Sequence, residues 1–290
     1  EPRFDPNSGF SRLESVSISQ ASADQRAGRA GRIAAGICYR LWPQSQRLEV
    51  SRTPEIAQVE LAALALELAQ WGADLNWLDA PPAGALAQAR DLLRSLGALD
   101  AHDSITALGR HLLAAATHPR LAAALVRAEG GERALACDLL ALVEARNPLR
   151  GDDARRDDFR LRVAALHARD GVAFQVDRSA LAAIRQSADA WRRRFGIARD
   201  SLASDDALAV GNVLMHAFPD RIARQDPGNP RRYQLANGRG ARLLDDSVLF
   251  GDSHVDKTIG KAGLERQQPG RPGIAAVIAM SRESRSPSRT

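Results

Sequence analysis

The stretch from residue 106 to residue 200 constrains the fold of this chain more than any other part of it. It is rich in Ala and Leu, and short pairs such as Gly130-Gly131 and Asn147-Pro148 punctuate it. Aromatic residues make up only 4% of the sequence, which favours helices packed on helices over a β-sandwich. We therefore predict five successive helices, at about residues 107–116, 119–128, 131–146, 155–170 and 178–195.

The residues before this stretch predict two more helices and a small β-wing, which is the layout of a winged-helix domain. Thr53 is a suitable N-cap with Pro54 at the first helical position, and Gly72 ends that helix. A second helix ends at Gly97, and residues 98–106 form the wing. The apolar residues of these two helices are Ile56, Val59, Leu64, Leu68, Trp71, Leu86, Leu92, Leu93 and Leu96.

Short β-elements are expected on both sides of the helices, so the predicted fold class is α+β, mostly α. Residues 14–19 alternate apolar and polar side chains and follow a turn at residues 5–9, which indicates a hairpin. Residues 36–42 predict another short strand. Residues 233–238 and 239–243 predict two strands about an Asn-Gly turn. A helix between these regions should begin at the N-cap Ser204 and carry Leu208, Val213 and Leu214.

The tail from residue 251 to residue 290 predicts no core of its own. It is rich in Pro, Gly, Ser and Arg, and only residues 274–280 form an apolar run. Such a composition is typical of disorder, or of an aberrant reading-frame end.

Charge and cysteine content exclude several classes of protein. The formal net charge is +5, of which residues 251–290 carry seven basic minus four acidic, or +3, so charge alone does not predict nucleic-acid binding. Cys38 and Cys137 lie far apart, which predicts two reduced, buried thiols and neither a zinc site nor a disulfide. No apolar run is long enough to span a membrane, and the N-terminus has no features of a signal peptide. We expect a cytoplasmic protein and an internal cut or processed end before Glu1.

The most informative motif is QRAGRAGR at residues 25–32. It brings one amide and three guanidinium groups together with small residues between them. Arg29 and Arg32 are three residues apart and share one helical face, and two rigid guanidinium groups suit a polyphosphate. Gly28 and Gly31 allow close backbone approach. On composition alone, a solvated basic helix start with a glycine-rich kink is the more common arrangement, because Arg-Gly runs occur in many proteins.

The whole string resembles the last signature motif of superfamily 2 helicases in the DEAH-type form. Other motifs resemble that family in the expected order, and the last two resemble its bacterial HrpB branch. They lie at residues 4–9, 53–56, 77–82, 96–99, 108–110, 118–121, 219–223 and 235–240. The resemblance covers roughly residues 2–250.

The resemblance implies a site and a set of domains. Arg29 and Arg32 would be arginine fingers that contact the γ-phosphate of ATP, and Gln25 would help to place the attacking water or the phosphate. The implied domains are the C-terminal part of a second RecA-like domain (1–52), a winged helix (53–105), a helical ratchet domain (106–200) and the start of an OB-like domain (201–250).

The sequence contains neither a G-x-x-x-x-G-K-[ST] phosphate loop nor a DEAH string. We therefore expect a C-terminal portion of an ATP-dependent RNA helicase. The portion alone would be inactive, and ATP and Mg²⁺ would bind the intact enzyme together with its missing first RecA-like domain.

The implied partner is single-stranded RNA, or DNA. The resembling family places the strand near its OB-like domain, where the basic candidates are Arg221, Arg224, Arg231, Arg232, Arg239 and Arg242. Residues 191–195 (WRRRF) are a second candidate, although two core aromatics beside a solvated basic face are the more common arrangement. A non-enzymatic module for nucleic-acid binding or partner docking is the alternative function.

Overall fold

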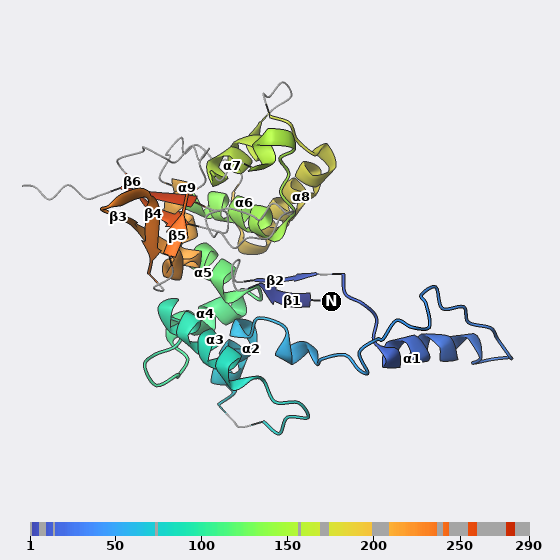
Figure 1. The fold of residues 1–290 in the computed structure, drawn as a ribbon. Coiled ribbons are helices and arrows are strands. Elements are labelled where there is room, and N and C mark those ends of the chain that lie inside the picture. The colour runs from blue at the N-terminus through green and yellow to red at the C-terminus, as the bar shows by residue number, and fades with distance from the viewer. Residues whose placement is uncertain are drawn as a thin grey trace, which may run out of the picture. The chain divides into compact units, whose positions relative to one another are not determined.

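A computed structural model describes residues 2–5, 10–13, 15–72, 75–155, 158–168, 174–198, 209–236, 240–243, 255–259 and 277–281 (Figure 1). The chain divides into two compact units. One unit contains residues 1–61 and 73–89, and the other contains residues 62–72 and 90–290. The described part is mostly helical and contains a two-stranded and a five-stranded antiparallel sheet. None of its helices has the length and apolar character that crossing a membrane requires.

The first unit begins with a hairpin, which lies earlier than the sequence predicts. β1 (Pro2–Asp5) pairs antiparallel with β2 (Phe10–Leu13). Residues 15–19, expected as a strand, form none and lead instead to Ser19, whose Oγ accepts the Ser22 N–H at 3.2 Å and caps α1 (Gln20–Ala30). The strand expected at residues 36–42 is also absent. A strand needs a neighbour for its backbone groups, and the described part of this unit offers none to either segment.

The predicted helix at Thr53 begins later than expected. Residues Glu55–Ala57 form a single 3₁₀ turn (η1) without a side-chain cap, and α2 is Ala62–Trp71. Its buried residues are Ala62, Ala65 and Leu66, whereas Trp71 is 70% exposed, so the expected apolar face was wrong. The small alanines allow α2 to contact α4 and α5 closely, and this packing selects the buried face. Gly72, with φ of +73°, ends the helix as predicted.

The second predicted helix and its wing are present in reduced form. α3 (Ala83–Ser95) contributes Leu93 to the core, and the fully buried Leu96 follows it. The wing is a single antiparallel bridge between Leu99 and Ile105. Gly109 lies in the first turn of α4, where a Cβ would be 2.2 Å from the Ala98 carbonyl oxygen. Only glycine therefore allows this close contact between the wing and the next helix.

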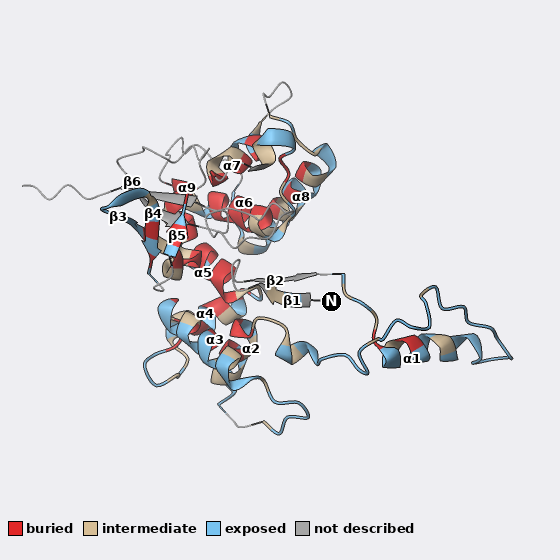
Figure 2. Ribbon diagram, in the orientation of Figure 1, coloured by how far each residue is buried: buried red, intermediate tan, exposed pale blue. Residues whose placement is uncertain are grey.

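The five helices predicted between residues 106 and 200 are confirmed. They are α4 (Ala107–Ala114), α5 (Pro119–Arg127), α6 (Glu132–Glu144), α7 (Phe159–His167) and α8 (Arg178–Phe195), with a 3₁₀ turn η2 at Gly151–Arg155. Local caps explain their starts. Thr106, His118, Asp158 and Asp177 each accept a hydrogen bond from a first-turn N–H, and Gly196, with φ of +61°, ends α8. Figure 2 shows α5 and α6 as the most buried elements of this bundle.

A buried carboxylate joins three of these helices. Asp138 of α6 is 1% exposed, and its Oδ1 accepts a hydrogen bond from Nη2 of Arg192 on α8 at 2.5 Å. Its second oxygen lies 3.0 Å from Nε2 of His167 on α7, and Arg192 also binds Asp189 at 3.0 Å. The neighbouring Cys137 is buried as predicted, and burial raises the pKa of its thiol to about 11. Cys38 is exposed, contrary to prediction, because the segment around it lacks a covering layer in this chain.

The C-terminal part is a sheet covered by a helix. α9 (Ala209–Ala217) contacts α5, α6 and β7, while the cap expected at Ser204 lies outside the described residues. After the 3₁₀ turn η4 (Pro219–Arg221), five antiparallel strands have the order β5-β4-β3-β6-β7. They are β3 (Ile222–Asp226), β4 (Asn229–Leu235), β5 (Gly240–Arg242), β6 (Val255–Ile259) and β7 (Val277–Ser281). The buried face carries Ala223, Tyr233, Leu235, Ala241 and Leu243.

Two features of this sheet differ from the sequence prediction. The strands at residues 233–243 are confirmed, with Tyr233 opposite Ala241, but β3 was not foreseen. The tail after residue 250 was expected to have no regular structure, yet β6 pairs with β3 and β7 pairs with β6. A short apolar run does not need its own core when an existing strand supplies the ladder partner.

Candidate nucleotide and nucleic-acid sites

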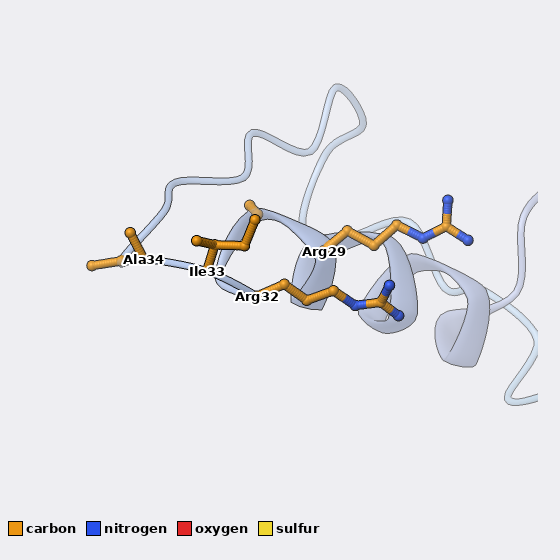
Figure 3. A pocket seen from close by; sticks show the side chains of 6 residues that line it. Arg29, Arg32, Ile33 and Ala34 are labelled. Atoms are coloured by element: carbon orange, nitrogen blue, oxygen red, sulfur yellow. The ribbon is translucent and has the colours of Figure 1, made fainter.

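The arginines of the QRAGRAGR motif gather at the end of α1. Arg29 lies in the last turn, and Arg32 follows the C-cap Gly31. Both line an open pocket of about 680 Å³, and their side chains extend in the same direction (Figure 3). The other lining residues are Ala30, Ile33, Ala34 and Ala35. Gln25 lies about one turn earlier on α1, is exposed, and does not line the pocket.

The glycines around this pocket have two different roles. A Cβ on Gly28 or Gly31 would meet no atom within 4 Å, so packing within the chain does not require glycine at either position. A Cβ on Gly36 would lie 1.9 Å from the carbonyl oxygen of Ala30, so glycine is required where the chain folds back on α1. The space beside the first two glycines is therefore open, and the third allows the close approach of the returning segment to Ala30.

The returning segment is tied to α1 along its length. Arg40 forms an ion pair with Asp24, which also accepts a hydrogen bond from the Gln20 side chain at 2.9 Å. The hydrogen bond from Arg40, followed by that from Gln20, lowers the pKa of Asp24. At the other end of the segment, the Gln20 N–H donates to the Glu49 carbonyl at 2.8 Å.

One face of the returning segment is apolar and uncovered. Ile37 and Leu41 are 77% and 94% exposed, and Tyr39 between them is also exposed. These residues alternate with Arg40, which points back to Asp24 on α1. The backbone here is irregular, but Ile37, Tyr39 and Leu41 keep the two-residue spacing of side chains on one face of a strand.

The candidate arginines near the sheet do not all lie on one face. Arg224, Arg232 and Arg242 are exposed, and we call these three the outer arginine row. In the strand register Arg232 lies directly opposite Arg242, and Arg224 lies opposite Gln234 beside them. The row is therefore on the face opposite to Tyr233 and Leu235, since side chains alternate along a strand.

The remaining candidates have other positions. Arg221 is buried, with its guanidinium 5.0 Å from the Phe218 ring centroid. It is therefore not available to a nucleic-acid strand bound on the outer face of the sheet. Its burial follows from the contact that the 3₁₀ turn makes with α9, which the sequence did not reveal. Arg231 is half-buried, and Arg239 lies outside the described residues.

Most side chains of the WRRRF motif on α8 make contacts within the helical bundle. Trp191 and Phe195 stack with ring centroids 6.1 Å apart, and Arg194 lies over both rings. Arg192 is buried against Asp138. Burial raises the pKa of Glu144, and a hydrogen bond from the Trp191 side chain partly offsets this. The contacts favour the structural interpretation of this motif.

Comparison with known proteins agrees with the family resemblance. The chain is 38% identical over 253 residues to the ATP-dependent RNA helicase HrpB of Escherichia coli K12, a match that covers 85% of this chain and 28% of that protein. It is 40% identical over 104 residues to a probable ATP-dependent RNA helicase DHX35 homolog of Caenorhabditis elegans, covering 34% of this chain and 14% of that protein. No family model matches the chain.

Two crystal structures of the E. coli protein, described as a DExH-box NTPase and as a DEAH/RHA helicase, match with TM-scores of 0.61 and 0.60. Both are 33% identical to this chain and cover 97% and 99% of it, and the chain covers 32% and 34% of theirs. The chain is therefore homologous to the DEAH/RHA helicases. Within that class it is homologous to HrpB, and the chain spans about a third of the length of the HrpB proteins it matches.

Proposed function

We propose that this chain is the C-terminal part of an ATP-dependent RNA helicase of the HrpB type. The observation that carries the proposal is the pair Arg29 and Arg32, which line an open pocket at the end of α1 and extend in one direction (Figure 3). Two guanidinium groups supply up to ten N–H donors in a planar geometry that matches phosphate oxygens. The pocket lining contains no carboxylate that would repel a polyphosphate.

In this proposal the two arginines contact the γ-phosphate of ATP bound to a preceding RecA-like domain. Charge on the γ-phosphoryl oxygens shifts during hydrolysis, and fixed guanidinium groups stabilise the transition state more than the ground state. Gln25, one turn earlier on the same helix, would orient the attacking water or the phosphate. Mg²⁺ would be held by residues of the preceding domain, because the pocket lining offers no oxygen ligand from a side chain.

The exposed apolar side chains of residues 36–42 support the proposal that a β-sheet lies beside α1 in the intact protein. Ile37, Tyr39 and Leu41 are exposed and alternate with Arg40, which pairs with Asp24 on α1, so an apolar face at strand spacing lies open beside this helix. We propose that residues 36–42 become a strand when the preceding part of the protein supplies the neighbouring strands. Residues 1–52 are then the end of the second RecA-like domain.

The helices and strands of the structure are consistent with the other proposed domains. α2, α3 and the Leu99–Ile105 bridge fit a winged helix at residues 53–105, and α4 to α8 fit a ratchet domain at residues 106–200. The sheet with α9 fits an OB-like domain that starts at residue 201. Because β6 and β7 extend the same sheet, we assign residues 255–281 to that domain as well.

Single-stranded RNA is the proposed ligand of the outer arginine row. Like charges directly opposite each other destabilise a sheet, so Arg232 and Arg242 repel each other in the free protein. An anionic ligand bound between them would remove this repulsion. A phosphate backbone would neutralise the row without any requirement for sequence.

The isolated chain should show no ATP hydrolysis, with or without RNA. Its sequence contains no phosphate loop, and phosphoryl transfer needs both walls of the nucleotide site. The measurement is phosphate release by the purified chain with Mg-ATP, with the intact protein as the positive control. Turnover by the isolated chain that disappears on Arg29→Ala would contradict the proposal.

The double charge reversal Arg232→Glu with Arg242→Glu should weaken RNA binding by the isolated chain and reduce its salt dependence. If each arginine contacts one phosphate, the slope of log K against log salt should shrink by about 1.4, at roughly 0.7 per contact on a single strand. Fluorescence anisotropy with labelled oligo(U) across a salt series measures both quantities.

The matched control reverses Arg133 and Arg178, which are exposed on α6 and α8 and change the net charge equally. The control should lower affinity slightly and leave the slope near that of the wild type. Equal slopes for the two double variants would move the RNA contact away from the sheet. No binding by the wild type at low salt would favour a partner-docking role for this chain.

A further inference from the structure

The motifs at residues 118–121 and 219–223, which lie outside the nucleotide site, contact each other through one buried ion pair. Arg120, the second residue of α5, belongs to the string at residues 118–121, and Asp220 belongs to the string at residues 219–223. The Arg120 guanidinium donates from Nη1 to Asp220 Oδ1 at 2.5 Å and from Nη2 to Asp220 Oδ2 at 3.0 Å. Nη1 also donates to the carbonyl of Ala217, the last residue of α9, at 3.1 Å.

The surroundings make this contact stronger than a surface ion pair. The Arg120 side chain is 6% exposed, and its guanidinium lies 5.2 Å from the Phe218 ring centroid. Burial would raise the pKa of Asp220, but the hydrogen bonds and charge of Arg120, with a smaller contribution from Arg221, lower it. Asp220 is therefore a carboxylate at neutral pH, and the pair is a bidentate, partly desolvated ion pair.

The contact lies where the sheet begins. Ala217 ends α9, residues Pro219–Arg221 form η4, and β3 starts at Ile222. Arg120 thus binds both the end of the helix that covers the sheet and the turn that leads into its central strand. Because β3 pairs with both β4 and β6, its direction sets that of the neighbouring strands.

We propose that Arg120 and Asp220 are positioning residues that hold the outer arginine row in a fixed orientation on the helical bundle. The row comprises Arg224 on β3, Arg232 on β4 and Arg242 on β5, so the orientation of β3 fixes all three. A rigid row can meet successive phosphates of one strand together, whereas a mobile sheet meets fewer at a time. This inference rests on the proposed function of the row in RNA binding.

Asp220→Asn separates positioning from simple electrostatics. The substitution removes a negative charge, so electrostatic attraction alone would strengthen binding to a polyanion. Positioning predicts the opposite: affinity for oligo(U) should fall by about two- to thirtyfold, the range for coupling through packed side chains, and the salt slope should shrink. Asp152→Asn, an equal charge change at an exposed residue of η2, should not weaken binding.

Two conservative variants test the geometry of the pair. Arg120→Lys keeps the charge but cannot form the two parallel bonds, so it should weaken binding as Asp220→Asn does. Asp220→Glu keeps the carboxylate and should restore much of the affinity. If Arg120→Lys binds RNA like the wild type, charge and not geometry matters, and the positioning role is wrong.

Hydrogen exchange tests, without RNA, whether the Arg120–Asp220 contact holds the sheet against the helical bundle. In Asp220→Asn, the amides of β3 and β4 should lose protection while those of α6 keep it. Unchanged protection and unchanged RNA affinity together would overturn the proposal. If the wild type itself does not bind RNA, the proposed function fails. Hydrogen exchange alone then decides whether the Arg120–Asp220 contact holds β3 in place. Should Asp220→Asn also expose α6, Arg120→Lys takes its place in both measurements.

Discussion

In the intact protein that contains this chain, Arg29→Ala or Arg32→Ala will lower RNA-stimulated ATP turnover by roughly 10³–10⁵-fold, the usual contribution of an arginine finger. The physical reason is that both arginines line the pocket at the end of α1 and extend in the same direction, so that in the proposed function each guanidinium would meet charge that develops on the γ-phosphate. The loss should fall mainly on kcat and not on KM, because a finger acts in the transition state. Steady-state kinetics with saturating RNA measures the two constants.

The control for this prediction is Arg47→Ala, which removes an exposed arginine from the same unit, outside the residues that line the pocket. It should leave turnover close to that of the wild type. Arg29→Lys should be intermediate, since lysine keeps the charge but not the planar donors. A double Arg29→Ala, Arg32→Ala variant with near-normal turnover would show that the assigned roles are wrong.

Asp138→Ala will destabilise the helical bundle by about 3–5 kcal/mol, the usual cost of removing one partner from a buried ion pair. The substitution leaves the Arg192 guanidinium buried, with its ion pair to the part-exposed Asp189 still in place. It also removes the hydrogen-bond partner of His167, so α6, α7 and α8 lose a shared contact. Urea unfolding monitored by circular dichroism measures the difference in free energy.

Asp152→Ala is the matched control, because this aspartate is exposed and should leave the unfolding midpoint nearly unchanged. Replacing Asp138 and Arg192 together by apolar residues of similar volume should cost less than Asp138→Ala alone, because no buried charge then lacks its partner. A loss of less than about 1 kcal/mol in Asp138→Ala would mean that water reaches Arg192 and replaces the carboxylate.

Local chemistry explains which sequence predictions were confirmed. The helices between residues 106 and 200 end and begin at capping residues such as Thr106, Asp177 and Gly196, which act on their own first or last turn. The β4–β5 pair follows from the strand patterns on both sides of the Asn-Gly dipeptide in the sequence. The family resemblance, carried by short motifs in a defined order, is confirmed by homology to HrpB. The roles of Gln25, Arg29 and Arg32 stay predictions.

By itself, then, the sequence determined the helical middle of this protein, the pairing of β4 with β5 and the homology to helicases, because each depends on neighbouring residues or on short sequence motifs. Only the tertiary structure decided which groups are buried and what they contact. Arg221 and Arg224 are close in sequence, yet one is buried near Phe218 and the other lies on the outer face of the sheet. β7 likewise forms by pairing with β6 of the same sheet. Pairings of this kind join residues far apart in the chain, and no local pattern records them.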